Sequence, residues 1–418
     1  MNSTAASDQM SVRNLIESQV NTNPHVVAIL GTGLSPISYE ALLAQVDQIA
    51  AYVQSFGIRS HDRVASVMPN GPQALVVFLG VTTVATYAPL NPQLTINEIT
   101  GLLFDLQAKA LIVDPTVGAA AITAANDLGI QVLEVAPLLQ HCAAPITRNS
   151  CANEKAQRLV PNSLTDIALT LHTSGTTSKP KLVPLTHENL CTSARNTVAA
   201  LGLSTADRCL NVMPMFHIHA LMASLASIAA GGSVICASGA EPNEFFVSLK
   251  QYRPSWYTAS PAIHQMILRG SADYQETLKS CPLRFIRSSS SALPEQVLRE
   301  LEETFLVPVI ECYAMTEASY QITANPVCWK RKIGSVGMAA GPDLGIMDHH
   351  GELLPPNSPG EVVIRGTNVM GGYENNPNAN LESFHKGWFR TGDIGFLDHE
   401  GYLFLKGRTK EIINKGGE

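Results

Sequence analysis

The segment Leu171–Leu190, with the sequence LHTSGTTSKPKLVPLTHENL, constrains the fold more than any other part of this chain. An apolar run at 167–171 predicts a buried strand, and a second short strand is expected at 182–185. Between them, residues 173–181 consist only of Ser, Thr, Gly, Lys and Pro. Hydroxyl, ammonium and backbone N–H groups gathered in this way suit the oxygens of phosphate groups. Thr186 is placed to cap the helix that follows.

Other interpretations of this segment are weaker. A flexible surface loop could have the same composition, but such a loop does not usually separate two buried strands. The GxxxxGK[ST] phosphate loop is excluded, because both its glycine spacing and its final Lys-Ser/Thr pair are missing.

The segment resembles the phosphate-binding loop of the adenylate-forming enzymes, the superfamily of acyl-CoA synthetases, peptide adenylation domains and firefly luciferase. The pattern in that family is T-S-G-T-T-G-x-P-K-G, and Ser178 and Leu182 stand here in place of two of its glycines. We therefore expect a somewhat stiffer loop. The resemblance implies that the triphosphate is contacted by Thr173, Ser174, Gly175, Thr176, Thr177, Lys179 and Lys181, with Lys181 counted among the catalytic residues.

The bulk properties set limits on the class of protein. A length of 418 residues with 45% hydrophobic residues predicts a large buried interior divided into two or three subdomains. The net charge of −7 and the lack of a basic run argue against a nucleic-acid partner. Eight cysteines without a CxxC pair fit reduced core thiols in an intracellular protein.

No targeting or membrane segment is predicted. The N-terminus lacks the pattern of a signal peptide, and no apolar stretch approaches the roughly 18 residues that a membrane span needs. We therefore expect a soluble cytoplasmic protein. The peroxisome is the alternative, since its address is read at a C-terminus.

Helical and strand patterns alternate through most of the chain. Helices are expected at 11–19, 37–56, 72–82, 97–107 and 220–230, and strands at 63–68, 86–90, 110–113, 129–134, 207–213, 233–236, 255–258, 284–287 and 307–311. Such alternation predicts an α/β fold with two layered subdomains and mostly parallel sheets.

The expected divisions follow changes in this pattern. The first α/β subdomain is expected at 1–162, ending in an irregular segment, 137–162, that crosses as a loop to the second subdomain at 163–330. Short β runs at 334–337 and 361–365 and a hairpin at 395–405 then predict a small antiparallel sheet or barrel-like subdomain, 331–405. Residues 406–418 are expected to form a hinge to a further domain.

The sequence ECYAMTE, Glu311 to Glu317, follows a predicted strand and resembles the family motif G-Y-G-x-T-E. The resemblance implies that Tyr313 stacks on adenine, Thr316 contacts the α-phosphate and Glu317 holds Mg²⁺, with Glu311 and Cys312 also in the nucleotide site. Mg²⁺ accepts carboxylate and phosphate oxygens, so these residue types suit it. The alternative is an ordinary strand-to-helix turn capped by Thr316.

Two further motifs complete the nucleotide site. Thr-Gly-Asp393 resembles the family's T-G-D, whose aspartate binds both ribose hydroxyls, and a carboxylate suits a vicinal diol. In GRTKEIIN the resemblance places Arg408 on the ribose and Lys410 at the hinge. Taken alone, these residues are a common turn and solvated charges. Four motifs in the family's order, over nearly the whole chain, favour the resemblance.

The acyl pocket is predicted from His217 and His219, which follow Pro214 in the sequence PMFHIH. In the family this position flanks the acyl pocket, so His217 is expected beside the carboxylate that is activated. Both histidines could donate hydrogen bonds to an anionic substrate, although a histidine among apolar residues is more often a satisfied core residue.

Departures from the family pattern bear on the size of the acid. Many relatives have glycine where this chain has Cys312 and Ala314, and Gly-Ala-Ala where it has Ser289, Ser290 and Ser291. These serines are assigned to the nucleotide site, and Ser289, Cys312 and Ala314 also to the substrate. A filled pocket predicts a short acid, with discrimination of ~1–3 kcal/mol per methylene. The F-H-I-H, S-S-S-S-A-L and Y-A-M-T-E-A variants are similar to those of oxalyl-CoA synthetases, so oxalate is the leading hypothesis.

The resemblance implies an AMP-forming acid–thiol ligase that uses ATP, Mg²⁺ and CoA. Family members continue beyond the hinge with a domain that carries the lysine bridging the substrate carboxylate and the α-phosphate, and none of Lys406, Lys410 or Lys415 matches its motif. The chain is therefore expected to be the large domain of a longer enzyme and to adenylate slowly by itself. The alternatives are a domain that loads a phosphopantetheinyl carrier protein and an inactive nucleotide-binding interaction module.

Overall fold

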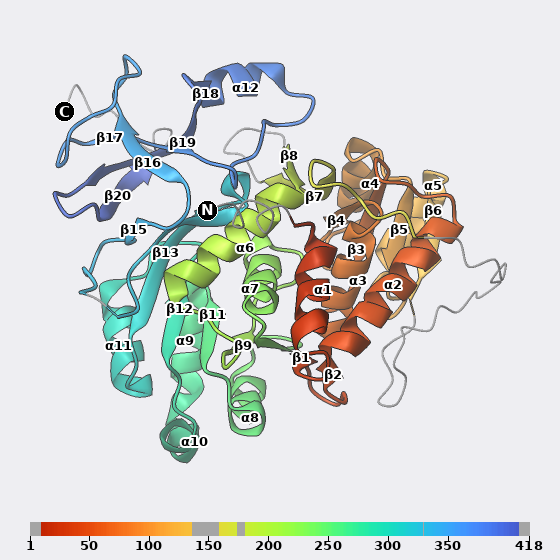
Figure 1. Ribbon diagram of the computed structural model, residues 1–418, viewed down its shortest axis with the longest axis horizontal. Helices are drawn as coiled ribbons and strands as arrows, with labels where there is room; N and C mark the ends of the chain where they lie inside the picture. The colour runs from red at the N-terminus through yellow and green to blue at the C-terminus, as the bar shows by residue number, and fades with distance from the viewer. Residues whose placement is uncertain (1–9, 136–158, 174–179, 329, 409–418) are drawn as a thin grey trace.

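The computed structural model of this chain describes residues 10–135, 159–173, 180–328 and 330–408 (Figure 1). Within these residues, the strands form three sheets. Two sheets are wide and mostly parallel, and the third is antiparallel. This arrangement confirms the predicted α/β class with a β-rich C-terminal part. In the same described ranges, no helix has the length and apolar character needed to cross a bilayer.

The larger sheet has nine described strands in the order β15-β14-β13-β12-β11-β9-β10-β1-β2. Neighbours from β13 to β1 are parallel, whereas β2, β14 and β15 are antiparallel to their neighbours. The strands are β1 (Val27–Leu30), β2 (Ile37–Ser38), β9 (Arg208–Asn211), β10 (Ser233–Cys236), β11 (Trp256–Ala259), β12 (Phe285–Ser288), β13 (Val309–Met315), β14 (Tyr320–Ala324) and β15 (Met338–Ala339).

One predicted strand is wrong. Residues 334–337 form a turn and irregular chain, and the strand in this region is β15. Gly334 and Gly337 have φ values of 80° and 92°, which a regular strand does not accommodate. At Gly337 a Cβ atom would lie 2.0 Å from the backbone carbon of Ala324, so close backbone approach requires glycine there.

The second sheet has six described strands in the order β6-β5-β3-β4-β7-β8. It is parallel except for β8, which forms an antiparallel edge against β7. The strands are β3 (Arg63–Val67), β4 (Thr86–Pro89), β5 (Ala110–Val113), β6 (Gln131–Glu134), β7 (Ile167–Thr173) and β8 (Lys181–Thr186).

The predicted divisions at residues 162 and 330 remain predictions. The sheets do not follow these divisions. β1 and β2 come from the first predicted subdomain but lie in the larger sheet, and β7 and β8 come from the second but lie in the smaller sheet. Most of the segment 137–162, predicted as a crossing loop, lies outside the described residues.

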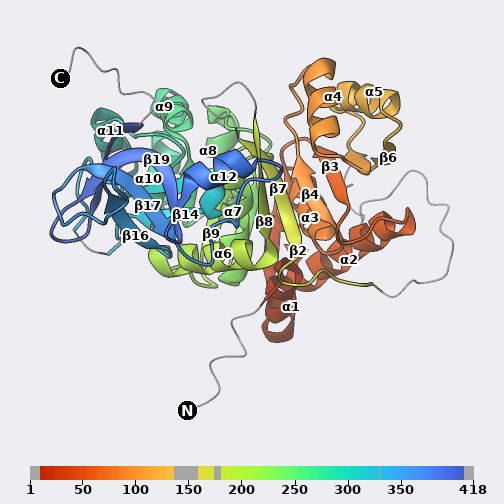
Figure 2. The same ribbon diagram turned by 90° about the horizontal axis from the view of Figure 1, so that it is seen from above.

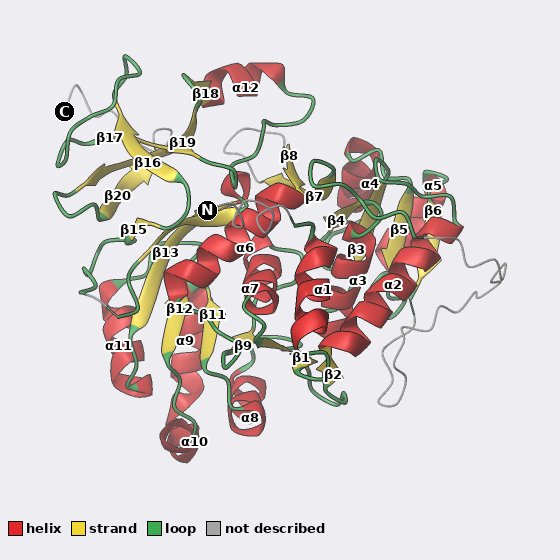
Figure 3. Ribbon diagram, in the orientation of Figure 1, coloured by secondary structure: helices red, strands yellow, loops and turns green. Residues whose placement is uncertain are grey.

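A layer of helices lies between the two wide sheets (Figures 1 and 3). It contains α1 (Val12–Thr22), α2 (Tyr39–Ser55), α3 (Pro72–Thr82), α6 (His187–Leu201) and α7 (Ile218–Ala229). Their buried apolar side chains join those of both sheets in one core. As predicted, Ser38 caps α2 and Thr186 caps α6, each accepting a backbone N–H with its hydroxyl.

Further helices cover the outer faces of the sheets. Helices α4 (Ile96–Asp105) and α5 (Ala119–Asp127) pack on the smaller sheet. Helices α8 (Pro242–Tyr252), α9 (Pro261–Gly270) and α11 (Glu295–Phe305) pack on the larger one, beside the short helix α10 (Gln275–Ser280). Strand residues alternate between the two faces, as shown by Val64 in the central core and Ala65 in the outer one.

The C-terminal part forms an antiparallel sheet in the order β16-β17-β19-β18, with β20 also paired to β19. It is the blue region beside the larger sheet in Figure 2. Its elements are β16 (Asp343–Met347), β17 (Gly360–Arg365), α12 (Pro377–Ser383), β18 (Phe384–His385), β19 (Trp388–Leu397) and β20 (Leu403–Arg408). The β19–β20 hairpin confirms the turn predicted at residues 395–405.

Candidate active site

The predicted phosphate loop connects the two strands of a hairpin. β7 and β8 pair antiparallel, and Thr173 lies opposite Lys181 in their register. Of the predicted phosphate ligands, Ser174, Gly175, Thr176, Thr177 and Lys179 lie outside the described residues. The hairpin therefore fixes the two ends of the loop, Thr173 and Lys181.

Lys181 lies beside a residue that the sequence did not single out. Its ammonium nitrogen is 4.4 Å from the ring centroid of Tyr373, which belongs to the segment between β17 and α12. A cation over an aromatic face is attracted by the negative face of the ring. Tyr373 thus connects the hairpin to the C-terminal sheet.

The same tyrosine holds the predicted metal ligand. Its hydroxyl donates a 2.8 Å hydrogen bond to Oε1 of Glu317. Among the described residues, no other side chain or backbone group donates to that carboxylate. Burial, with the neighbouring Glu317 carboxylate, raises the pKa of Tyr373, so its hydroxyl remains a donor at neutral pH.

Thr316 and Glu317 begin the short 3₁₀ helix η2 (Thr316–Ala318) directly after β13. The residue at its N-cap is Met315, which makes no side-chain cap, so Thr316 does not serve as a helix cap. Glu317 is buried and Thr316 half-buried. The threonine hydroxyl is thus available for another role.

Glu317 fits the demands of a nucleotide-bound Mg²⁺. Within the described ranges, no cluster of three acidic, histidine or cysteine side chains forms an all-protein metal site. Mg²⁺ commonly uses one or two carboxylates and takes its other ligands from phosphate oxygens and water. A single buried carboxylate with one oxygen oriented by Tyr373 matches that donor set, and Glu317 would hold the ion.

We predict that Tyr373→Phe weakens Mg²⁺ binding while keeping the ring under Lys181. Loss of a hydrogen bond that orients a metal ligand typically costs about 10-fold in metal affinity. The Mg²⁺ concentration that half-saturates binding of a non-hydrolysable ATP analogue should rise by that factor in calorimetry. Tyr402→Phe is the matched control. Like Tyr373, Tyr402 donates a hydrogen bond with its hydroxyl, here to the Lys330 carbonyl, and has a lysine ammonium over its ring, that of Lys332 at 4.4 Å from the ring centroid. An unchanged Mg²⁺ requirement in Tyr373→Phe would contradict the prediction.

The predicted adenine and ribose residues are brought together although they are far apart in sequence. The Tyr313 hydroxyl donates to Oδ2 of Asp393, and Arg408 Nε donates to Oδ1 at 3.0 Å. Asp393 and Arg408 are register partners in the β19–β20 hairpin. Each carboxylate oxygen has two lone pairs, so both can still accept a second hydrogen bond from a diol.

Glu311 lies two residues before Tyr313 and is buried at the end of the parallel register of β13. The Leu293 backbone N–H donates to it at 3.4 Å. Burial raises the pKa of Glu311 to about 7. At neutral pH this carboxyl is therefore part protonated, unlike an exposed glutamate.

This pKa predicts a pH-dependent stability. A pKa raised from 4.5 to about 7 means that the folded state binds the proton more tightly, so stability from this group is present below pH 4.5 and is lost as the pH rises to 7. The loss amounts to roughly 3 kcal/mol at 1.36 kcal/mol per pKa unit. Glu311→Gln should flatten the dependence between pH 5 and 8 in urea unfolding. An equal slope in both proteins would contradict the assignment.

The predicted acyl-pocket residues also lie together. His219 is buried, with Nδ1 2.8 Å from the Ser290 hydroxyl and Nε2 2.6 Å from that of Thr258. Ser289 is buried and donates to the Cys312 carbonyl at 3.2 Å. With both ring nitrogens engaged, His219 has the arrangement of a satisfied core histidine, and its role as a substrate ligand stays a prediction.

The remaining predicted residues are more accessible. His217 is exposed at the N-cap of α7, and Ser290 and Ser291 are exposed after β12. Ser290 has a φ of 80°, in the region that favours glycine, and its hydroxyl contacts His219. Ala314 is half-buried in β13.

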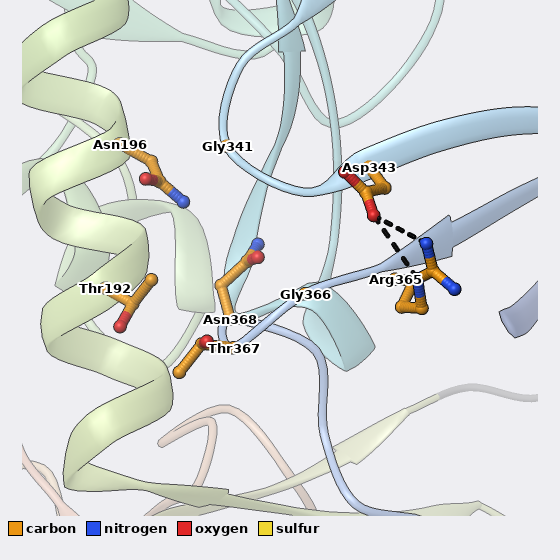
Figure 4. Close-up of a pocket in the computed structure, with 8 residues that line it drawn as sticks. All are labelled: Thr192, Asn196, Gly341, Asp343, Arg365, Gly366, Thr367 and Asn368. Atoms are coloured by element: carbon orange, nitrogen blue, oxygen red, sulfur yellow. Dashed lines mark hydrogen bonds and ion pairs between the residues drawn. The ribbon is translucent and has the colours of Figure 1, made fainter. Parts of the chain in front are cut away.

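A cavity of about 600 Å³ lies elsewhere, between α6 and the C-terminal sheet (Figure 4). Thr192 and Asn196 line it from α6, and the Asp343–Arg365 ion pair lies at one side. None of the predicted site residues lines it. The candidate site is therefore defined by the contacts around Tyr313, Glu317 and Asp393.

Comparison with known proteins was made on the sequence and on the fold. The family model described as "AMP-binding enzyme" matches residues 16–374. An oxalate–CoA ligase of Arabidopsis thaliana is 40% identical over 98% of this chain and 81% of its own length. An oxalate–CoA ligase of Saccharomyces cerevisiae is 39% identical, over 85% of this chain and 70% of its own length. The crystal structure of ATP-bound MatB from Rhodopseudomonas palustris superposes with a TM-score of 0.86 at 28% identity, covering 98% of this chain and 81% of that protein.

Proposed function

The chain belongs to the AMP-binding enzyme family, and on this premise we propose that it activates a small carboxylic acid, with oxalate as the first candidate, to an acyl-CoA thioester. In the first step a carboxylate oxygen attacks the α-phosphorus of ATP, and the bond to the pyrophosphate group breaks. In the second step the CoA thiol, losing its proton, attacks the acyl carbon and AMP leaves.

The observation that carries the proposal is that predicted site residues from segments far apart in the sequence meet in two contact clusters. Asp393 joins Tyr313 to Arg408, and Tyr373 joins Glu317 to Lys181 at the end of the predicted phosphate loop. No covalent nucleophile is needed for this chemistry. The residues contribute position and charge: Asp393 orients the ribose, Lys181 neutralises phosphate charge, and Thr316 donates to the α-phosphate.

Mg²⁺, when bound through Glu317, would neutralise charge on the phosphates. His217, which is exposed at the N-cap of α7, is assigned the donation of a hydrogen bond to the carboxylate that is activated. The two oxalate–CoA ligases among the relatives, and the burial of Cys312 at a position where many relatives have glycine, support a short acid.

Exchange of labelled pyrophosphate into ATP, with the purified full-length protein and a panel of two- to six-carbon mono- and diacids, tests the proposal. Exchange is expected to depend on acid and to be fastest with oxalate. Exchange with long-chain or cinnamate-type acids but not with oxalate would overturn the choice of substrate, and no exchange with any acid would favour an inactive nucleotide-binding module. Addition of CoA, and separately of a phosphopantetheinyl carrier protein, identifies the acceptor.

A further inference from the structure

Arg287 is an arginine that the folded chain encloses completely. It lies in β12 with no exposed surface, among the largest fully buried side chains. Its Nε donates to Cys312 Sγ at 3.4 Å, and its Nη2 donates to Oε1 of Gln321. Its guanidinium carbon lies 4.6 Å from the ring centroid of Tyr320.

Two features of these contacts are unusual. The buried Nη1 has no hydrogen-bond partner among the described residues, and no carboxylate in the same ranges pairs with this guanidinium. A buried charge without a counter-charge is costly, so proteins normally pair it. The contacts with a thiol, an amide and a ring offset only part of that cost.

The position of this charge relates it to the acyl site. Arg287 precedes Ser288, Ser289 and Ser290 in the chain, and its partner Cys312 accepts from Ser289 through its carbonyl. His219, bonded to Ser290, has its ring centroid 4.9 Å from that of Tyr320. The uncompensated cation therefore shares a contact partner with Ser289, through Cys312, and with His219, through Tyr320.

We propose that Arg287 is a specificity-determining residue that makes this site select a short dianion, a two-carbon dicarboxylate, over a monoanion of the same size. The inference rests on the proposed function and names a residue and a charge requirement for it. The Arg287, Gln321 and Tyr320 side chains are all buried in contact with one another or with Cys312, so they leave little room for a longer acid. The unpaired charge, with Nη1 unsatisfied, favours a second carboxylate in the predicted acyl site, because opposite charges attract more strongly where the surroundings have a low dielectric constant.

Oxalate and oxamate provide the test, since they have nearly the same shape and differ by one negative charge. In the wild-type protein, kcat/KM for pyrophosphate exchange should be about 10- to 150-fold higher for oxalate than for oxamate, the factor that corresponds to the ~1.5–3 kcal/mol of an interaction with a charged group. In Arg287→Met the ratio should fall to within a few-fold of one, mainly through loss of oxalate activity. Arg287→Lys should retain part of the preference, because it keeps the charge.

Arg208→Met is the matched control. Arg208 belongs to β9 of the same sheet and donates to Ser233 and to the Tyr252 carbonyl, but is not among the predicted site residues. Its replacement should leave the ratio unchanged. Circular dichroism and binding of an ATP analogue show whether each variant is folded.

Several outcomes would overturn the inference. An unchanged oxalate-to-oxamate ratio in folded Arg287→Met would do so. If Arg287→Met does not fold, equal activity of the wild-type protein on oxalate and oxamate would overturn the inference. Complete loss of the preference for oxalate in folded Arg287→Lys, with oxamate activity unchanged, would also overturn it. If the wild-type protein exchanges pyrophosphate with no acid, the proposed function fails separately. Calorimetric binding of oxalate and oxamate to the ATP-analogue complex then decides the inference, with equal affinities counting against it.

Discussion

Asp393→Asn is expected to weaken ATP binding by at least about 100-fold, because it removes the charge behind hydrogen bonds worth about 1.5–3 kcal/mol each. Asp393 accepts from Tyr313 and from Arg408, and these residues lie where the proposed adenine and ribose contacts meet. Asparagine keeps the shape of the aspartate side chain. Its NH₂ group, however, would face either the Tyr313 hydroxyl or the Arg408 guanidinium, and both of these are already donors. Calorimetry with a non-hydrolysable ATP analogue measures the loss.

Modified nucleotides separate a ribose contact from a general loss of structure. If Asp393 accepts from the ribose hydroxyls, 2′-deoxy- and 3′-deoxy-ATP should each bind the wild-type protein more weakly than ATP. The variant should hardly distinguish the three nucleotides, since the interaction is already lost. Equal sensitivity in both proteins would place the ribose elsewhere.

Asp343→Asn is a close structural control. Asp343 on β16 and Arg365 on β17 are register partners and form an ion pair of 3.0 Å. Asp393 on β19 and Arg408 on β20 have the same arrangement and the same distance. The Asp343 pair is exposed, and exposed pairs contribute at most about 1 kcal/mol. Replacing it should leave ATP affinity unchanged.

The local elements of this fold were predictable because local chemistry determines them. Ser38 and Thr186 offer the hydroxyl that a helix start needs, and Pro72 occupies the first turn of α3, where its missing N–H is harmless. The β19–β20 hairpin follows from apolar runs around a polar turn. The order of strands in each sheet did not follow in the same way, since it depends on contacts between distant segments.

The same distinction applies to the candidate site. Motif residues such as Tyr313 and Asp393 were identified because each lies in a short recognisable pattern, and the structure brings them into contact across 80 positions. Tyr373 was missed because its importance comes from Glu317, 56 positions away, and from Lys181.

Arg287 was missed for a different reason. It was included in a predicted strand. A charged residue between Ile286 and Ser288 of a buried strand is unusual and indicates that a residue of opposite charge, or a ligand, is needed nearby. The sequence shows that such a charge is present. Only the packing shows that, among the described residues, no carboxylate neutralises it.

The second large effect is expected for Glu317→Gln, which should slow acid-dependent pyrophosphate exchange by about 100- to 1000-fold, the range for loss of one group that stabilises the transition-state charge. Glutamine keeps the length of the side chain and can still accept from Tyr373, so the fold should survive. It cannot supply a negative oxygen to Mg²⁺, which strongly prefers charged oxygen ligands. The Mg²⁺ dependence of ATP-analogue binding should therefore weaken together with the rate.

Glu374→Gln tests whether loss of any carboxylate in this region would have the same effect; the Glu374 side chain is half-buried. Glu374 follows Tyr373 in the chain and pairs with Arg63 of β3 rather than with the nucleotide residues. Its loss is expected to lower stability by about 1 kcal/mol or less without changing the Mg²⁺ requirement. If Glu317→Gln loses no more exchange than Glu374→Gln, then Glu317 does not hold the ion.

The Tyr373→Phe variant shows how the tyrosine acts. If its Mg²⁺ requirement shifts in the same direction as that of Glu317→Gln but by less, the tyrosine positions Glu317. A shift in Tyr373→Phe without one in Glu317→Gln means that the ion is held by another group.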